Sequence, residues 1–156
     1  MATQSSAAGA AGLVAQPSLT LKRRLNAPPQ KVYAAWTEAE KIVRWFGPSQ
    51  VKPGSARADI EPRTGGRFRI SMEMEDGTYH EVRGIYREAV PYQRLVFSWA
   101  WHSTPERESL VTVSLQPDGG GTLLTLHHEQ FADQAARDSH EGGWIGTLDK
   151  LEKFIA

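Results

Sequence analysis

The segment HEGGWIGTLDKLEKF, residues 140–154, decides the fold, because it predicts a long amphipathic helix at the end of the chain. Apolar side chains recur there at three- and four-residue steps, which is the period of one helix face. They are Trp144, Leu148, Leu151 and Ile155, and the same face extends back to His140. Starting near Ala132, the helix would have about 23 residues and a length of about 35 Å, enough to cross a whole sheet.

Two adjacent glycines, Gly142 and Gly143, precede Trp144 in this helix, although each costs about 1 kcal/mol relative to alanine. One explanation is clearance, in which the small residues allow close approach of the sheet or leave room for a ligand beside Trp144. The other is a hinge, in which the regular helix begins only at Trp144. Both explanations allow the segment to move, which access to a buried cavity requires.

Upstream of this helix, the periodicity predicts two short helices followed by a run of strands. Residues 18–25 alternate like an opening strand, and the short helices are expected at 26–37 and 37–46, the second behind a Thr37–Glu40 capping box. Strands with one apolar face are expected at 51–62, 66–74, 78–90, 94–101, 109–115 and 122–131. A long helix on one face of such an antiparallel sheet is an α+β arrangement.

An Asp-Gly pair predicts a hairpin between the strands that flank residues 76–78. We expect a three-residue loop, 76–78, which pairs Met74 with His80. The alternative two-residue loop would turn Glu81 and Arg83 toward the interior, because a slip of one residue moves every side chain to the other face.

Composition indicates one soluble globular domain of 18–156 behind a tail of small, uncharged residues at 1–17, which we expect to be disordered. Lys plus Arg and Asp plus Glu both number 18, so no basic field points to nucleic acid. The absence of cysteine excludes a disulfide framework, a thiolate metal site and a cysteine nucleophile. No apolar run could span a membrane, and we expect a cytoplasmic protein.

Several strings share their order and spacing with one known family. They are NAPPQKVYAAWT (26–37) with WFGP (45–48), DIEPRTGGRFR (59–69), the Asp-Gly hairpin with GIY (84–86), PYQRLVFSW (91–99), GGGTLLTLHHEQF (119–131) and GWIGTLDKL (143–151). Together they resemble the START-like (SRPBCC) superfamily, in its branch of heat-shock-protein ATPase activator homologues. The resemblance implies a helix-grip fold, β-α-α-β6-α, in which a curved antiparallel sheet wraps around the C-terminal helix.

The resemblance also implies a cavity between sheet and helix that takes apolar small molecules. Alternation along the strands and the helix period select the side chains that would line it. The candidates are Trp45, Phe46, Phe68, Ile70, Met72, Trp99, Trp101, Leu126, His128, His140, Gly143 and Trp144. His128 and His140 could orient the polar end of a ligand or act as acid and base, whereas their ordinary role is that of hydrogen-bonded, partly buried histidines.

Non-catalytic binding of a small apolar ligand is therefore the favoured function, with no cofactor and no metal. No nucleophile–base pair, phosphate loop or paired carboxylates can be recognised in the sequence. A co-chaperone-type interaction module is the first alternative, because exposed Arg63, Arg67 and Arg69 would suit an acidic protein partner. A cyclase- or hydrolase-like enzyme using the cavity histidines is the second. A void of several hundred Å³ would favour ligand binding.

Overall fold

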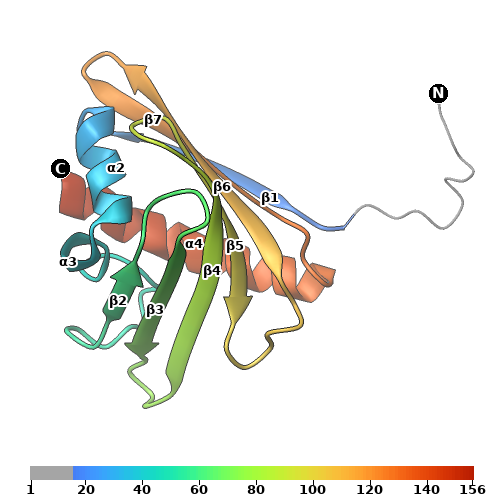
Figure 1. Ribbon diagram of the computed structural model, residues 1–156. Helices are drawn as coiled ribbons and strands as arrows, with labels where there is room; N and C mark the ends of the chain where they lie inside the picture. Colours follow the sequence, from blue (N-terminus) through green and yellow to red (C-terminus); the bar gives the residue numbers. More distant parts are fainter. Residues whose placement is uncertain (1–15) are drawn as a thin grey trace, which may run out of the picture.

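A computed structural model describes residues 16–156 and shows a curved seven-stranded antiparallel sheet gripping a long C-terminal helix (Figure 1). The predicted α+β helix-grip fold is confirmed. The elements, in chain order, are β1 (Leu19–Leu25), α2 (Pro29–Thr37), α3 (Ala39–Ile42), β2 (Arg57–Ile60), β3 (Arg67–Glu73), β4 (Tyr79–Val90), β5 (Arg94–Trp101), β6 (Ser109–Asp118), β7 (Gly121–Glu129) and α4 (Gln134–Ile155).

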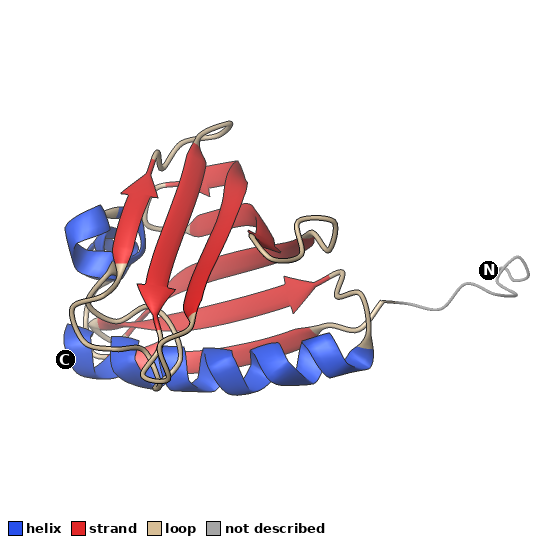
Figure 2. Ribbon diagram, turned by 90° about the horizontal axis from the view of Figure 1, so that it is seen from below, coloured by secondary structure: helices blue, strands red, loops and turns tan. Residues whose placement is uncertain are grey.

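The strand order β1-β7-β6-β5-β4-β3-β2 places the first two strands of the chain at opposite edges of the sheet. The two short helices α2 and α3 connect these edges and lie together at one end of the molecule (Figure 1). Seen from below, α4 runs beneath the strands for most of the length of the described domain (Figure 2). Among residues 16–156, no helix combines the length and apolar character that crossing a bilayer requires.

The β3–β4 hairpin has the predicted faces but a different register. Met72 lies opposite His80, and the Met74 N–H donates to the Thr78 carbonyl at 2.8 Å, so the loop is residues 75–77 rather than 76–78. The predicted pairing of Met74 with His80 is therefore wrong by two residues. A slip of two keeps every side chain on its predicted face, and Val82 is accordingly fully buried.

The short helices lack the predicted capping box. Thr37 belongs to the end of α2, where its hydroxyl donates to the Tyr33 carbonyl at 2.8 Å. Glu38 is the N-cap residue of α3 and makes no side-chain cap. The Trp45 indole donates to the Ala35 carbonyl at 3.1 Å, which ties the segment after α3 to α2.

Helix α4 is continuous from Gln134 to Ile155, so the hinge explanation of the two glycines is wrong. Its first turn is capped by Asp133, whose carboxylate accepts from the Ala136 N–H at 2.8 Å. Most of the predicted tail, residues 1–15, lies outside the described residues. Its last two residues do contact the domain, because the Phe131 N–H donates to the Pro17 carbonyl and the Gln16 amide donates to the Phe131 carbonyl.

Candidate ligand-binding pocket

A pocket of about 400 Å³ lies between the first half of α4, strands β3 to β5 and the segment after α3. This volume is in the range that holds a small organic ligand. Its lining is mainly aromatic and apolar and includes four hydroxyl residues, of which Ser103 and Ser139 are exposed. The lining residues are Phe46, Gly47, Pro48, Met72, Met74, His80, Trp99, Trp101, Ser103, Thr104, Ser139, His140, Gly143, Trp144 and Thr147.

Seven of the predicted site residues meet around this pocket. They are Phe46, Met72, Trp99, Trp101, His140, Gly143 and Trp144. Three of them come from the inner face of the sheet, three from α4, and Phe46 from the segment after α3. The aromatic rings pack against one another at this site, with centroids 5.1 Å apart for Trp99 and Trp144 and 5.5 Å apart for Trp99 and Trp101.

The other five predicted residues lie outside the pocket. Phe68 and Ile70 line a separate void of only about 10 Å³, deeper in the core. Trp45, Leu126 and His128 are fully buried and do not reach the pocket. Alternation along the strands correctly placed four of these residues on the inner face of the sheet, namely Phe68, Ile70, Leu126 and His128. Only the part of that face that the helices leave uncovered borders the pocket.

Several lining residues were not among the candidates. Ser139 and Thr147 extend the helix face of His140 and Gly143 by steps of four, so the helix period could have identified them. The remaining lining residues come from loops and strand ends, and among them only Met74 and His80 carried an alternation signal, two residues from Met72 and Val82. These remaining residues are Gly47, Pro48, Met74, His80, Ser103 and Thr104.

Gly143 provides open space in the pocket wall. A Cβ atom built on Gly143 or Gly142 meets no atom within 4 Å, so neither glycine is required for close approach of the sheet. Close approach occurs one turn later, where a Cβ on Gly146 would lie 3.4 Å from the Ser49 nitrogen. The clearance explanation allowed either close approach of the sheet or room for a ligand beside Trp144. The second fits Gly143, because this residue lines the pocket.

The segment after α3 is held against α4 by Lys150. Its half-buried ammonium donates to the Pro48 carbonyl at 3.2 Å and to the Phe46 carbonyl at 3.5 Å. Burial lowers the pKa of Lys150. Gly47 has φ +96°, and a side chain there would collide with Val51 and Met72, so the tight bend at this pocket wall requires glycine.

His128 is locked in a buried hydrogen-bond network behind the pocket. The Trp144 indole N–H donates to its Nδ1 at 2.9 Å, which leaves Nε2 to carry the proton and donate to the Ser109 hydroxyl at 2.7 Å. The Ser109 hydroxyl in turn reaches the Trp99 carbonyl at 3.4 Å. Burial is the main cause that lowers the pKa of His128 to about 2, so this histidine is neutral at pH 7.

His140 is held in the same way at the pocket wall. The Trp101 indole N–H donates to its Nε2 at 2.9 Å, and Nδ1 lies 2.7 Å from the Ala136 carbonyl, so Nδ1 carries the proton. Burial lowers the pKa of His140 below its ordinary value, which keeps the ring neutral. Both histidines therefore use both ring nitrogens, and each accepts from a tryptophan.

Among the described residues, the side chains that line the pocket include no carboxylate and no lysine or arginine cation. Within residues 16–156, no three His, Asp or Glu side chains gather as a metal site would require. The arrangement can enclose an apolar molecule and offer neutral hydrogen-bonding groups at its open end.

Comparison with known proteins agrees with this architecture. The family model described as activator of Hsp90 ATPase homolog 1-like protein matches residues 26–156. No protein with a curated description matches the sequence closely enough to count as a relative.

Solved structures show the same fold. Protein CV1439 from Chromobacterium violaceum is 23% identical with a TM-score of 0.77, covering 89% of this chain and 97% of its own. The AHSA1 protein from Silicibacter pomeroyi is 26% identical with a TM-score of 0.75, covering 88% and 96%. CalU16 from Micromonospora echinospora is 29% identical with a TM-score of 0.64, covering 89% and 76%.

Proposed function

The chain belongs to the family of activator of Hsp90 ATPase homolog 1-like proteins, and on that premise we propose that it binds a small apolar molecule in the pocket beneath the first half of α4. The observation that carries this proposal is a space of about 400 Å³ walled by Phe46, Trp99, Trp101 and Trp144. The lining is mainly apolar and open to water at one end, so a bound apolar ligand would remove apolar surface of both molecules from water.

We propose further that the ligand is bound without being transformed. A general acid or base needs a pKa near the working pH and a free nitrogen within reach of the ligand. His128 lies behind the pocket wall, and its pKa of about 2 does not suit proton transfer near neutrality. His140 lines the pocket, but both its ring nitrogens are occupied, by Trp101 and by the Ala136 carbonyl.

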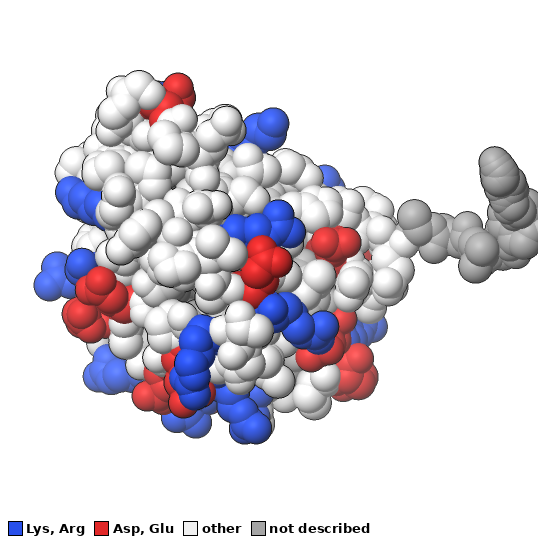
Figure 3. Space-filling view, turned by 45° about the horizontal axis from the view of Figure 1, so that its top comes forward, with Lys and Arg blue, Asp and Glu red and all other residues white. Residues whose placement is uncertain are grey.

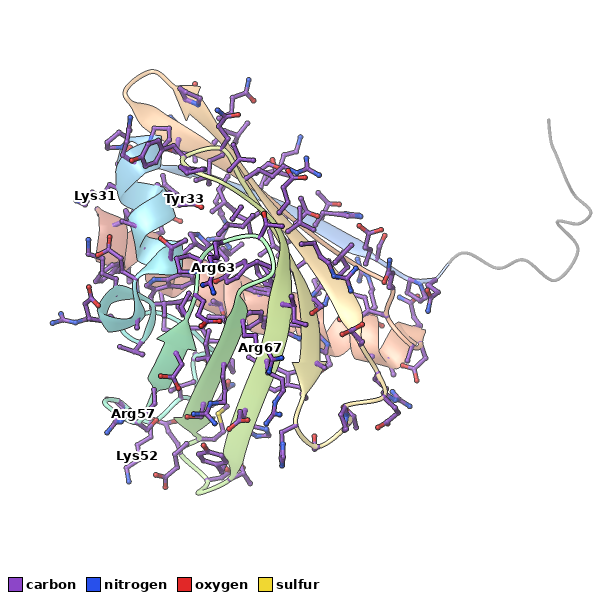
Figure 4. The ribbon with its side chains drawn as sticks, in the orientation of Figure 1. Lys31, Tyr33, Lys52, Arg57, Arg63 and Arg67 are labelled. Carbon is purple, nitrogen blue, oxygen red and sulfur yellow. The ribbon has the colours of Figure 1, made fainter. Side chains whose placement is uncertain are left out.

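The alternative of an acidic protein partner has less support from the charge distribution. Arg69 pairs with Asp59 at 2.9 Å, and Arg63 lies 4.0 Å from Glu61. Basic and acidic side chains are interspersed on the face that Figure 3 presents. Arg63 and Arg67 lie well apart from Lys52 and Arg57, which gather at the other end of β2 and β3 (Figure 4). The basic side chains of this region therefore form no single continuous patch.

The two adjacent glycines of α4 provide the test. Gly143→Leu places a side chain in the pocket, whereas Gly142→Leu makes the same change at an exposed position outside it. We expect the apolar dye Nile red to bind the Gly143→Leu variant at least about tenfold more weakly, since the leucine occupies space that the dye would fill and the resulting overlap costs about 1–3 kcal/mol. The Gly142→Leu variant should bind like the unchanged protein.

Fluorescence titration of Nile red, with circular dichroism to verify folding, makes this measurement. Equal binding by both variants would contradict the location of the site. Native mass spectrometry of the protein purified from its own host would then show whether a molecule is retained, and would give its mass.

A further inference from the structure

We propose that the pocket selects electrically neutral ligands, with the apolar body against the indole rings and an uncharged polar group at the open end. This inference rests on the proposed function and specifies the class of ligand. It follows from three features of the described residues: the lining, the two tryptophan–histidine pairs and the pairing of four cations in the surrounding elements.

The lining offers no counter-ion for a charged ligand. None of its side chains is a carboxylate, an ammonium or a guanidinium group. A charge that enters an apolar site without a partner loses its hydration without compensation, which disfavours its binding strongly. The wall of indole rings could attract a cation by its ring faces. The described lining has no carboxylate to pair with such a cation, so the ring faces alone would have to replace its hydration.

The tryptophan–histidine pairs prevent His140 and His128 from supplying a positive charge. The Trp101 N–H points at Nε2 of His140, so a proton on that nitrogen would face another donor and break the bond. The Trp144 N–H does the same at Nδ1 of His128. A carboxylate ligand would therefore meet the neutral imidazole of His140 at the wall, and protonating that ring would sacrifice an existing hydrogen bond. His80, the other lining histidine, is exposed, and its Nε2 lies 3.3 Å from the Thr78 hydroxyl.

Four cations in the elements around the pocket are already engaged. Arg83 pairs with Glu81, and Arg107 lies 3.4 Å from Asp133. Arg137, one turn before the pocket on α4, is 2.9 Å from Glu141 and 3.1 Å from Asp138. Lys150 donates to two carbonyl groups of the wall segment. Each of these positive charges has its own partner, and none is a member of the lining.

The open end suits an uncharged polar group. Ser103 and Ser139 are exposed and Thr104 is half-buried, and all three belong to the lining. Their hydroxyl groups can both donate and accept, so they match an alcohol, an ether or a carbonyl oxygen. The ligand we infer is thus an apolar molecule that carries such an oxygen at one end.

Three compounds that share one ring system test this inference. They are 1-pyrenemethanol, which is neutral, 1-pyrenecarboxylate, an anion, and 1-pyrenemethylammonium, a cation. Energy transfer from tryptophan to pyrene at pH 7 measures the binding of each. We expect the alcohol to bind at least about tenfold more tightly than either ion.

The outcomes separate this inference from the function on which it rests. If an ion binds as tightly as the alcohol, the pocket binds ligands but does not select by charge, and the inference is wrong. If none of the three compounds binds, the proposed function fails and the inference fails with it.

A gain of charge at the rim gives the matched test. Ser139→Lys adds an ammonium group to the lining, and Gln134→Lys adds the same charge on the same helix outside the pocket. We expect Ser139→Lys to raise the ratio of carboxylate binding to alcohol binding about tenfold, whereas Gln134→Lys should leave the ratio unchanged. An unchanged ratio in both variants would contradict the electrostatic explanation.

Discussion

The two halves of α4 have the same helical structure but different surroundings. In the C-terminal half, Leu148, Leu151 and Ile155 are at most 1% exposed and pack into the core. In the N-terminal half, the corresponding face carries His140 and Gly143 and borders the pocket. Trp144 stands at the junction, buried on one side and lining the pocket on the other. One amphipathic face can therefore close a core and also form the wall of a binding site.

Removing the junction residue should have the largest effect. Trp144→Ala is expected to lower the free energy of unfolding by about 3–5 kcal/mol, because it deletes a large buried ring and leaves His128 without its donor. Nile red binding should also be lost with the pocket wall. Urea denaturation and dye titration measure the two effects, and Trp144→Phe, which keeps a ring, serves as the milder control. A loss below about 1 kcal/mol would mean that Trp144 is not an anchor.

In the C-terminal half, a truncation should affect stability alone. Leu151→Ala is expected to cost about 2–5 kcal/mol, since the side chain is fully buried and a cavity remains in its place. Nile red affinity should be unchanged at a temperature where the variant is folded, because Leu151 does not line the pocket. Weakened dye binding in this folded variant would show that the two halves are not independent.

The polar network behind the pocket predicts a dependence on pH. Unfolding releases His128 from burial, so the unfolded chain binds a proton near pH 6.5, whereas the native protein does so only near pH 2. The free energy of unfolding should therefore fall as the pH drops below 6.5, by about 1.4 kcal/mol per pH unit from this group. Burial also lowers the pKa of His140, which acts in the same direction.

Urea denaturation at pH 5, 6 and 7 measures this dependence. The His128→Gln variant should show a slope that is smaller by about one proton, while it keeps a polar side chain at the position. Parallel slopes for the variant and the unchanged protein would contradict the assignment of His128 as a buried neutral ring.

The smallest effect is expected at the glycines. Gly142→Ala should stabilise the protein by up to about 1 kcal/mol, because alanine is the better helix former and its Cβ meets no neighbour. Gly146→Ala should gain less, since its Cβ would lie 3.4 Å from the backbone of Ser49. Thermal and urea unfolding of the two variants compare them directly. A larger gain in stability from Gly146→Ala than from Gly142→Ala would contradict this steric explanation.

The amino-acid sequence by itself determined the order of elements, the helix-grip fold and the side of each strand that faces inward. The order of elements and the inward sides follow from local periodicity, because a period of two or 3.6 residues assigns side chains to a face without reference to the rest of the chain. The helix grip was implied by the resemblance to a known family. Val82 and Leu126 are buried as their alternation predicts. The same rule could not assign the hairpin register, since loops of residues 75–77 and 76–78 place the strands' side chains on the same faces.

Only the tertiary structure decided which inward residues line the pocket. Phe68 and Trp99 both lie on the inner face of the curved sheet, yet Phe68 is sealed in the core and Trp99 borders the open space. The difference depends on which segments cover each part of the sheet in the folded chain, which no local pattern encodes. The protonation of His128 and His140 likewise depends on Trp144 and Trp101, whose indole groups reach them only in the folded chain.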